Sequence, residues 1–213
     1  MNGSYPHIET LVDRYPALAT VRADIESGLE LIIDRIRLDG TIYVCGNGGS
    51  AADADHIVAE LMKSFVKRRP IGDELIGSLE AASLQLGPKI AAMLQAGVPA
   101  SSLTGQSALS TAIANDVNAD MVFAQQLAIL GRKQDILWAL STSGNARNVL
   151  NAAVVARAKG LPVLGMTGTT GGALREFCDV CIRVPARETY EIQELHLPVY
   201  HALCLSIEDI LWP

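Results

Sequence analysis

Apolar residues recur at helical spacing through the first forty positions of the chain. Between Ile8 and Leu38 they fall three or four residues apart, as they do when one face of a helix is buried. Pro16 interrupts the series, and because proline lacks the amide hydrogen that a helix interior needs, the pattern predicts two helices. The apolar face of this helical arm must be buried against another surface. We expect a second subunit to supply that surface, in preference to docking of the arm on its own domain.

Further along the chain, short runs of branched apolar residues alternate with helical stretches. The runs predict strands at Thr41–Cys45, Ile136–Leu140, Val163–Met166 and Val180–Val184, with another at 100–103. The stretches predict helices at Ala51–Phe65, Asp120–Leu130, Ala146–Lys159 and Thr189–Leu211. Such alternation is typical of an α/β fold in which helices cover both faces of a parallel sheet. Ligands of these sheets bind beyond the carboxyl ends of the strands.

Residues 69–99 are punctuated by glycine and proline but retain many leucine and isoleucine residues. We interpret them as an ordered excursion with one helix near Lys89–Gln95. With 213 residues, of which 49% are hydrophobic, the chain is long enough to bury one core. We therefore expect a single domain over residues 1–213, in which 1–38 form the helical arm and 39–213 the α/β core.

The charge and the ends of the chain narrow the class of protein. A net charge of −6 argues against nucleic acid as a partner. No run of about 18 apolar residues predicts a membrane helix. The N-terminus lacks the basic and apolar segments of a signal peptide, so we expect a cytoplasmic protein.

The chain has four cysteines, which we expect to be free thiols. Cys178 and Cys181 form a C-x-x-C pair, a spacing found in redox and metal sites. No second pair accompanies them, and the surrounding "DVCIRVP" predicts a buried strand. We therefore interpret both cysteines as small hydrophobic packing residues.

Two turns rich in glycine or hydroxyl groups follow predicted strands and open predicted helices. The first is "CGNGGS" at Cys45–Ser50 and the second is "STSGN" at Ser141–Asn145. Small residues let the backbone approach an anion, and free amide groups at a helix start attract negative charge. Either turn alone is compatible with a simple strand-to-helix connection, but two at one sheet edge favour a phosphate site. A third such segment, 168–172, is less specific, and we interpret it as a simple turn in preference to a phosphate loop.

The same loops exclude two common nucleotide-binding classes. The chain has no G-x-x-x-x-G-K-[ST] motif, which disfavours a P-loop NTPase. "GNGGS" lacks the full dinucleotide fingerprint, which disfavours a nicotinamide cofactor.

His56 and Glu60 are four residues apart on a predicted helix and therefore share one face. Neutral imidazole and carboxylate groups are suitable zinc ligands. The same spacing also occurs in surface pairs and in core histidines that have a partner. The C-terminal helix carries further polar candidates at Gln193, His196 and His201.

Gln193 and His201 are eight residues apart, which is ~12 Å along a straight helix. They can ligate one ion only if the helix begins late, if it bends at Pro198, or if they come from different subunits. His196 is three residues from Gln193 and remains the alternative ligand.

In these residues the chain resembles the sugar isomerase (SIS) domain and, within that family, the phosphoheptose isomerases. The matching stretches, in family order, are "CGNGGSAADADHIVAEL", "AIAND", "DILWALSTSGNARNV", "GMTGTTGGAL" and "ETYEIQELHLPVYH". The resemblance implies a flavodoxin-like three-layer sandwich with about five parallel strands. It also implies a homotetramer with active sites at subunit contacts, and aldose–ketose isomerisation of sedoheptulose 7-phosphate.

The resemblance further assigns roles by position. It implies that substrate is bound by Asn47, Gly48, Gly49, Ser50, Glu60, Asn115, Asp116, Ser141, Thr142, Ser143 and Gln193. It matches Glu60 to the family's catalytic glutamate and His201 to its catalytic histidine. Since the reaction needs a base for the carbon-bound proton and an acid for the carbonyl oxygen, we assign Glu60 as the base and His201 as the acid, in an order that can reverse with direction. The resemblance selects His201 over His196, since the implied ligands of one zinc ion per subunit are His56, Glu60, Gln193 and His201.

Two features depart from the family pattern. Ala146 stands where a further phosphate-contacting serine is usual, and the segment between Leu61 and Asn115 is longer than usual, which bears on the identity of the sugar. Some relatives are non-enzymatic scaffolds that bind a replication initiator, and this is the alternative function. Those relatives lack the glutamate and the second histidine, whereas this chain retains Glu60 and His201. No DNA-binding segment accompanies the domain, as a sugar-phosphate-sensing regulator would require.

Overall fold

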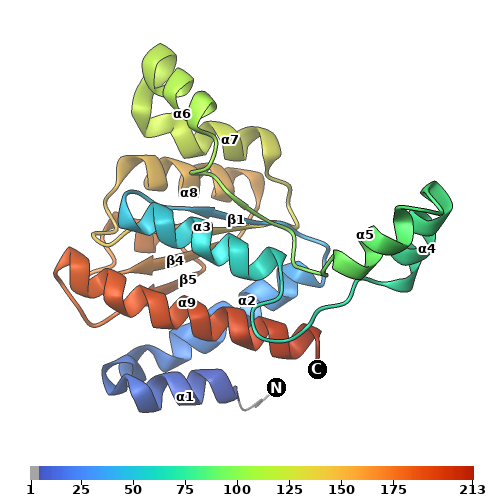
Figure 1. Cartoon of the computed structure of the whole chain (residues 1–213). Helices are drawn as coiled ribbons and strands as arrows, with labels where there is room; N and C mark the ends of the chain where they lie inside the picture. The colour runs from blue at the N-terminus through green and yellow to red at the C-terminus, as the bar shows by residue number, and fades with distance from the viewer. Residues whose placement is uncertain (1–4) are drawn as a thin grey trace.

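Five parallel strands form the centre of the structure, a computed structural model that describes residues 5–213 (Figure 1). The strands are β1 (Ile42–Cys45), β2 (Ala100–Ser102), β3 (Ile136–Leu140), β4 (Val163–Thr167) and β5 (Val180–Arg183). Their order in the sheet is β2-β1-β3-β4-β5, which is the flavodoxin-like order. The predicted α/β fold with five parallel strands is therefore confirmed, and every predicted strand is present to within one residue at either end.

Helices cover both faces of this sheet, because β1, β3 and β4 are buried along their whole length. One core lies under α2 (Arg22–Ile36), α3 (Gly49–Met62) and α9 (Thr189–Leu211). The second core lies under α7 (Val122–Leu130) and α8 (Arg147–Lys159). Three of these helices follow the loops at the carboxyl edge of the sheet, which places the starts of α3, α8 and α9 at that edge.

The N-terminal arm packs against its own chain. It consists of α1 (Pro6–Arg14), a 3₁₀ turn over Pro16–Val21, and α2, so Pro16 does separate two helices. Ile8 and Leu18 are fully buried in the core that α9 also lines. Our expectation that a second subunit covers this apolar face was wrong, since α9 and the sheet cover it.

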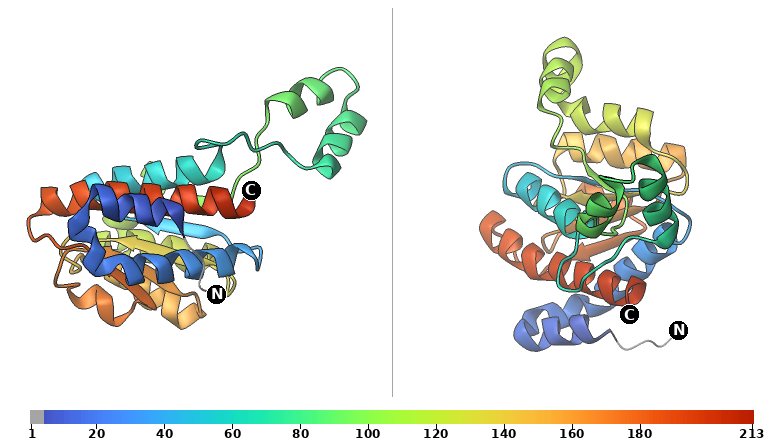
Figure 2. Two further views of the ribbon diagram at one scale, coloured as in Figure 1. Left: turned by 90° about the horizontal axis from the view of Figure 1, so that it is seen from below. Right: turned by 45° about the vertical axis from the view of Figure 1, so that its right-hand side comes forward.

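The segment from 69 to 99 is an ordered excursion, as predicted, and forms a helical hairpin that projects from the body (Figure 2). It contains α4 (Asp73–Ala82), which the sequence did not predict, and α5 (Gly87–Met93), close to the predicted helix. A bridge between Pro70 and Gln95 closes its base. No residue of α4 is buried, so this hairpin adds little to the described core.

A second projection precedes α7. It is built from α6 (Ser107–Ile113), a π-helical turn over Ala114–Asn118 and a 3₁₀ turn over Ala119–Met121 (Figure 1). α7 consequently begins at Val122, two residues later than predicted. Within residues 5–213, no helix combines the length and apolar character needed to cross a bilayer.

Candidate active site

The two predicted phosphate loops meet at one cavity of about 430 Å³ at the carboxyl edge of the sheet. The first loop follows β1 and the second follows β3, and these strands are neighbours. All the loop residues predicted to bind substrate line the cavity, together with Gln193 from α9: Asn47, Gly48, Gly49, Ser50, Ser141, Thr142 and Ser143. The described residues that line it are all uncharged, so it offers dipoles and neutral donors in place of a fixed cation.

Three helices begin at this cavity. Gly49 opens α3, Ala146 precedes α8 and Thr189 opens α9, and all three residues line the cavity. None of these helix starts has a side-chain cap. The first amide groups of a helix have no intrahelical partner, and the helix dipole favours an anion there. The cavity is therefore suited to a phosphate group, even though Ala146 contributes no hydroxyl.

The first loop is held in place by contacts with α8 and α9. The side-chain amides of Asn47 and Asn148 exchange two hydrogen bonds of 2.8 Å, which tie the first loop to α8. Gly48 has φ of 55°, a left-handed conformation that glycine adopts at low cost. Gly49 lies against Gln193, because a Cβ at Gly49 would be 2.6 Å from the Nε2 atom of Gln193.

α3 and α9 run side by side in the same direction from this cavity. Gly49 meets Gln193 at their starts, His56 meets Tyr200 about two turns later, and the backbone of Phe65 meets Glu208 beyond the end of α3. His56 follows Gly49 by seven residues, which corresponds to about 10.5 Å along the helix.

His56 and Glu60 form the pair that their spacing predicts. The Nε2 atom of His56 is 3.2 Å from Oε1 of Glu60, and the other carboxylate oxygen is 3.1 Å from Nζ of Lys63. The side chain of Glu60 is only 12% exposed. On the other side of the ring, Nδ1 of His56 is 3.0 Å from the hydroxyl of Tyr200.

Tyr200 extends this network to Asp53. Its hydroxyl donates to Oδ1 of Asp53 at 3.2 Å. Burial raises the pKa of Asp53, although the hydrogen bond from Tyr200 and the nearby His56 oppose this shift. Burial, together with the Asp53 carboxylate, also raises the pKa of Tyr200, so its hydroxyl keeps its proton near neutral pH.

His201 lies beside this pair. Its ring centroid is 5.0 Å from that of His56, and its Nε2 atom is buried with no partner among the described residues. Burial and the neighbouring His56 lower the pKa of His201, while Glu60 raises it to a smaller extent. The imidazole is therefore neutral at pH 7.

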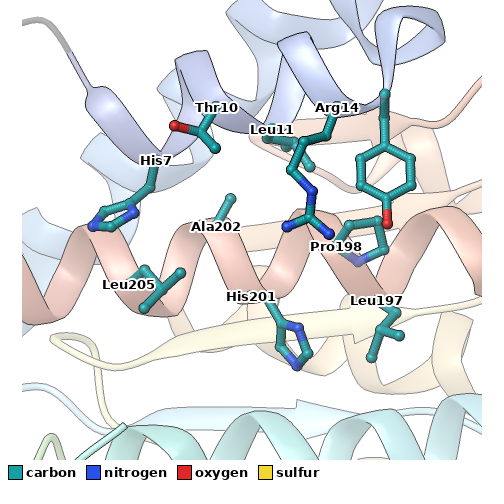
Figure 3. Close-up of a pocket in the computed structure, with 10 residues that line it drawn as sticks. His7, Thr10, Leu11, Arg14, Leu197, Pro198, His201, Ala202 and Leu205 are labelled. Atoms are coloured by element: carbon teal, nitrogen blue, oxygen red, sulfur yellow. The ribbon is translucent and has the colours of Figure 1, made fainter. Parts of the chain in front are cut away.

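A second cavity of about 210 Å³ lies between α1 and α9, and His201 lines it (Figure 3). The α1 residues His7, Thr10 and Arg14 border this cavity on the opposite side. In Figure 3 the His201 side chain extends away from α1, toward α3. His201 thus lies between the α1–α9 cavity and the His56–Glu60 pair.

The hydrogen bonds around His56 leave a position for either a proton or a metal ion between His56 and Glu60. When the single hydroxyl proton of Tyr200 goes to Asp53, Nδ1–H of His56 donates to Tyr200. The Nε2 atom then directs a lone pair at the carboxylate of Glu60, 3.2 Å away. Two acceptors at that distance need a proton or a metal ion between them. The donor chemistry fits zinc, although no group of three or more His, Cys, Asp or Glu residues within 5–213 surrounds a single point.

The other predicted residues lie elsewhere. α9 continues through Pro198, and Gln193 lies at the loop cavity, about two turns from His201. Asn115 and Asp116 are exposed on the projection before α7, where the Asn115 amide donates to the Asp116 carboxylate at 2.8 Å. His196 is fully buried, and burial lowers its pKa to about 4. A single chain therefore brings together the loops with Gln193, and separately His56, Glu60 and His201.

Sequence reasoning missed a buried ion pair behind this site. Nε of Arg69 donates to Glu208 at 2.7 Å, and both side chains are 1% exposed. Arg69 also donates to the backbone carbonyls of Glu60 and Leu61 at 3.1 and 3.0 Å, in the last turn of α3. The sequence signal, one arginine in "KRRP" and one acid in "SIEDIL", does not distinguish these residues from surface charges.

Comparison with known proteins agrees with this arrangement. A sequence model of the SIS domain matches residues 8–95 and 85–168. The phosphoheptose isomerase of Rhodospirillum rubrum is 38% identical over 203 residues, which cover 95% of this chain and 94% of that protein. The phosphoheptose isomerase of Thiobacillus denitrificans is 40% identical over 190 residues, covering 88% of this chain and 83% of the relative.

Solved structures give the same result. A phosphoheptose isomerase from Neisseria gonorrhoeae superposes with a TM-score of 0.69 at 30% identity, over 93% of this chain and 98% of that chain. One from Francisella tularensis has a TM-score of 0.73 at 28% identity, over 94% of each chain.

Proposed function

Because this chain belongs to the SIS domain family, we propose that it is a phosphoheptose isomerase that interconverts sedoheptulose 7-phosphate and an aldoheptose 7-phosphate through an enediol. The observation that carries the proposal is the pairing of two sites along α3 and α9: an uncharged anion cavity at their starts, and the His56–Glu60 pair with His201 further along.

The spacing of these two sites suits a long sugar. In an extended seven-carbon sugar phosphate, C2 is seven bonds from phosphorus, or ~8 Å at roughly 1.2 Å per bond. A five-carbon substrate reaches only ~6 Å. Glu60, the proposed base, follows Gly49 by eleven residues, or ~16.5 Å of helix, so the seven-carbon substrate covers more of the path from the anion cavity to the base than the five-carbon one does. The spacing supports seven carbons over five.

The proposed mechanism gives each residue one task. The loops and Gln193 hold the phosphate end, which fixes the reacting carbons beside the helix pair. Glu60 removes the proton from the carbon next to the carbonyl. His201 is neutral, and it donates a proton from its ring to the carbonyl oxygen, as neutral imidazole does in other enediol-forming enzymes. In the second half of the reaction the protonated Glu60 returns its proton to the adjacent carbon, and the ring nitrogen of His201 takes the proton of the other enediol hydroxyl, which forms the new carbonyl and restores both groups.

We further propose that His56, Glu60, Gln193 and His201 would hold a zinc ion, which would supply Lewis-acid polarisation of the carbonyl. Because the described residues of one chain do not gather three such ligands at one point, the site would form by movement of α9 or with ligands from different subunits. The two acceptors that face each other at His56 and Glu60 support this assignment. A carboxylate that ligates metal is a weaker base, so zinc binding and proton removal by Glu60 would compete.

The functional unit that we propose is a homotetramer. Asn115 and Asp116, which the family resemblance assigns to substrate, do not line the loop cavity of their own chain. A neighbouring subunit would bring this exposed pair to the site. Light scattering coupled to size exclusion measures the assembly, and a monomer with full activity would overturn this part of the proposal.

The test of the function is an isomerisation assay with five-, six- and seven-carbon ketose phosphates. We expect turnover with sedoheptulose 7-phosphate, and a loss of 10²–10⁴-fold in kcat for Glu60→Gln, as is typical when a general base is removed. Glu74→Gln is the matched control, because Glu74 is exposed on the projecting hairpin. Absence of turnover with every ketose phosphate would favour the scaffold alternative, and unchanged kcat in Glu60→Gln would remove Glu60 from the base role.

A further inference from the structure

Cys178 and Cys181 are not the fully buried packing residues that the sequence predicted. Cys181 does lie on a strand, β5, but both residues are partly exposed. β5 is an edge strand, so only one side of it is paired within the sheet. By contrast, Cys45 and Cys204 are buried in the two cores.

The two sulfur atoms converge on one point of the neighbouring strand. Gly165 of β4 is the residue that both approach. A Cβ on Gly165 would collide with Sγ of Cys178 and would be 3.5 Å from Sγ of Cys181. Because both contacts involve the same Cβ position, the two sulfurs are neighbours, and the absence of a side chain at Gly165 leaves the space that they share.

The surroundings of the two thiols differ. Sγ of Cys178 donates to the carbonyl of Leu174 at 3.2 Å, which favours its protonated form. Sγ of Cys181 is 3.8 Å from the hydroxyl of Thr167. The neighbouring Cys178 thiol, followed by Thr167 and Arg183, lowers the pKa of Cys181 against the effect of burial. The neighbouring Cys181 and burial raise the pKa of Cys178.

From this juxtaposition we propose that Cys178 and Cys181 form a dithiol site that a low-molecular-weight disulfide oxidises to an intramolecular disulfide, with Cys181 as the attacking thiol. The thiolate is the reactive form of cysteine, and reactivity requires access as well as deprotonation. Cys181 meets both conditions, whereas the buried Cys45 and Cys204 lack access.

The reaction proceeds by two exchanges. The Cys181 thiolate attacks one sulfur of the small disulfide, forms a mixed disulfide and releases one small thiolate. Cys178 then loses its proton and attacks Sγ of Cys181, which forms the Cys178–Cys181 bond and releases the second small thiol. Two protein thiols are oxidised and one small disulfide is reduced to two thiols, so electrons and protons balance.

The test uses the reduced full-length protein and glutathione disulfide as the probe. We expect the folded protein to lose two of its four titratable thiols and to retain no glutathionyl group, while peptide mapping finds Cys178 linked to Cys181. Cys178→Ser should trap one glutathionyl group on Cys181, because the resolving thiol is gone. Cys181→Ser should react much more slowly, and Cys204→Ser, a buried control, should behave like the parent protein.

Two results would overturn the inference. Retention of all four thiols in the folded protein, when the urea-unfolded protein reacts at all four, would reject the site. Equal rates of glutathionylation in Cys178→Ser and Cys181→Ser would reject Cys181 as the attacking thiol. Thiol counts and masses do not depend on catalysis, so this inference stands or falls separately from the isomerase proposal.

Discussion

Removal of Arg69 should destabilise the protein far more than removal of an exposed arginine. Arg69→Met deletes the ion pair with Glu208, the two hydrogen bonds to the end of α3, and the stacking of the guanidinium 4.7 Å above the Trp212 ring. Breaking a buried ion pair costs about 3–5 kcal/mol, because the remaining charge stays buried. The stranded Glu208 keeps hydrogen bonds from the amides of Phe65, Val66 and Lys67, each at 3.0 Å. We therefore expect the lower part of this range, about 3 kcal/mol.

The reciprocal change should cost more. Glu208→Leu leaves the Arg69 charge buried and also removes the acceptor for three backbone amides, so we expect about 5 kcal/mol. These amides, with Arg69, outweigh burial and lower the pKa of Glu208, which is therefore ionised at neutral pH. The control is Arg22→Ala, which breaks the partly exposed i,i+4 pair with Glu26 and the longer pair with Glu9, and it should cost far less than either core change because solvent screens these charges.

The assay is urea denaturation at one fixed protein concentration, because association into the proposed tetramer would make apparent stability depend on concentration. Tryptophan fluorescence reports the transition, since Trp138 is in the core. A cost for Arg69→Met no larger than that for Arg22→Ala would refute the reasoning. So would a cost for Glu208→Leu smaller than that for Arg69→Met.

Three other outcomes are expected. Gly49→Ala should displace Gln193 from the loop cavity and raise KM about fivefold, which corresponds to the loss of one neutral hydrogen bond of about 1 kcal/mol. The control Gly72→Ala, which has open space around it, should leave KM unchanged. Equal KM values for the two variants would show that Gln193 does not bind substrate. The pKa of His196 is about 4 in the folded protein and 6.5 in the unfolded chain. As pH falls below 6.5, the unfolded chain therefore binds a proton at His196 before the folded protein does, and the free energy of unfolding decreases. Between pH 7.5 and pH 5 this loss is ~2 kcal/mol, and His196→Leu should remove it; an unchanged pH dependence of urea midpoints would contradict the assignment. Removal of metal by a chelator should lower kcat and zinc should restore it, whereas full activity in metal-free protein would reject zinc.

The sequence predicted the fold well where the chain is periodic. Strands such as Ile136–Leu140 and the helix Thr189–Leu211 match the observed bounds, since continuous apolar runs and helical spacing follow directly from burial. α4 was missed because none of its residues is buried, so its apolar residues follow no core-facing pattern. We assigned the residues that bury the apolar face of the N-terminal arm to a partner subunit, because amphipathic spacing reveals an apolar face but not what packs against it.

The candidate site was predictable in part for the same reasons. Strand ends that meet at one sheet edge brought the two loops together, and i,i+4 spacing paired His56 with Glu60. The role of Tyr200 between His56 and Asp53 depends on the alignment of α3 with α9, which only the tertiary structure supplies. The location of Asn115 and Asp116 depends on the course of the chain after β2, where the sequence carries no periodic signal.

The parallel course of α3 and α9 has a consequence for evolution and for engineering. The distance from the anion pocket to the reacting groups is counted in helical residues, and each residue adds ~1.5 Å but also rotates the next side chain by ~100°. Insertion or deletion of one residue would therefore turn His56 away from Tyr200 before it changed the reach appreciably. Only a whole turn, ~5.4 Å, preserves the facing direction, and that is about the length of four carbon–carbon steps. Adaptation to a sugar one carbon shorter would have to come from the side chains that line the path, with the two helices left intact.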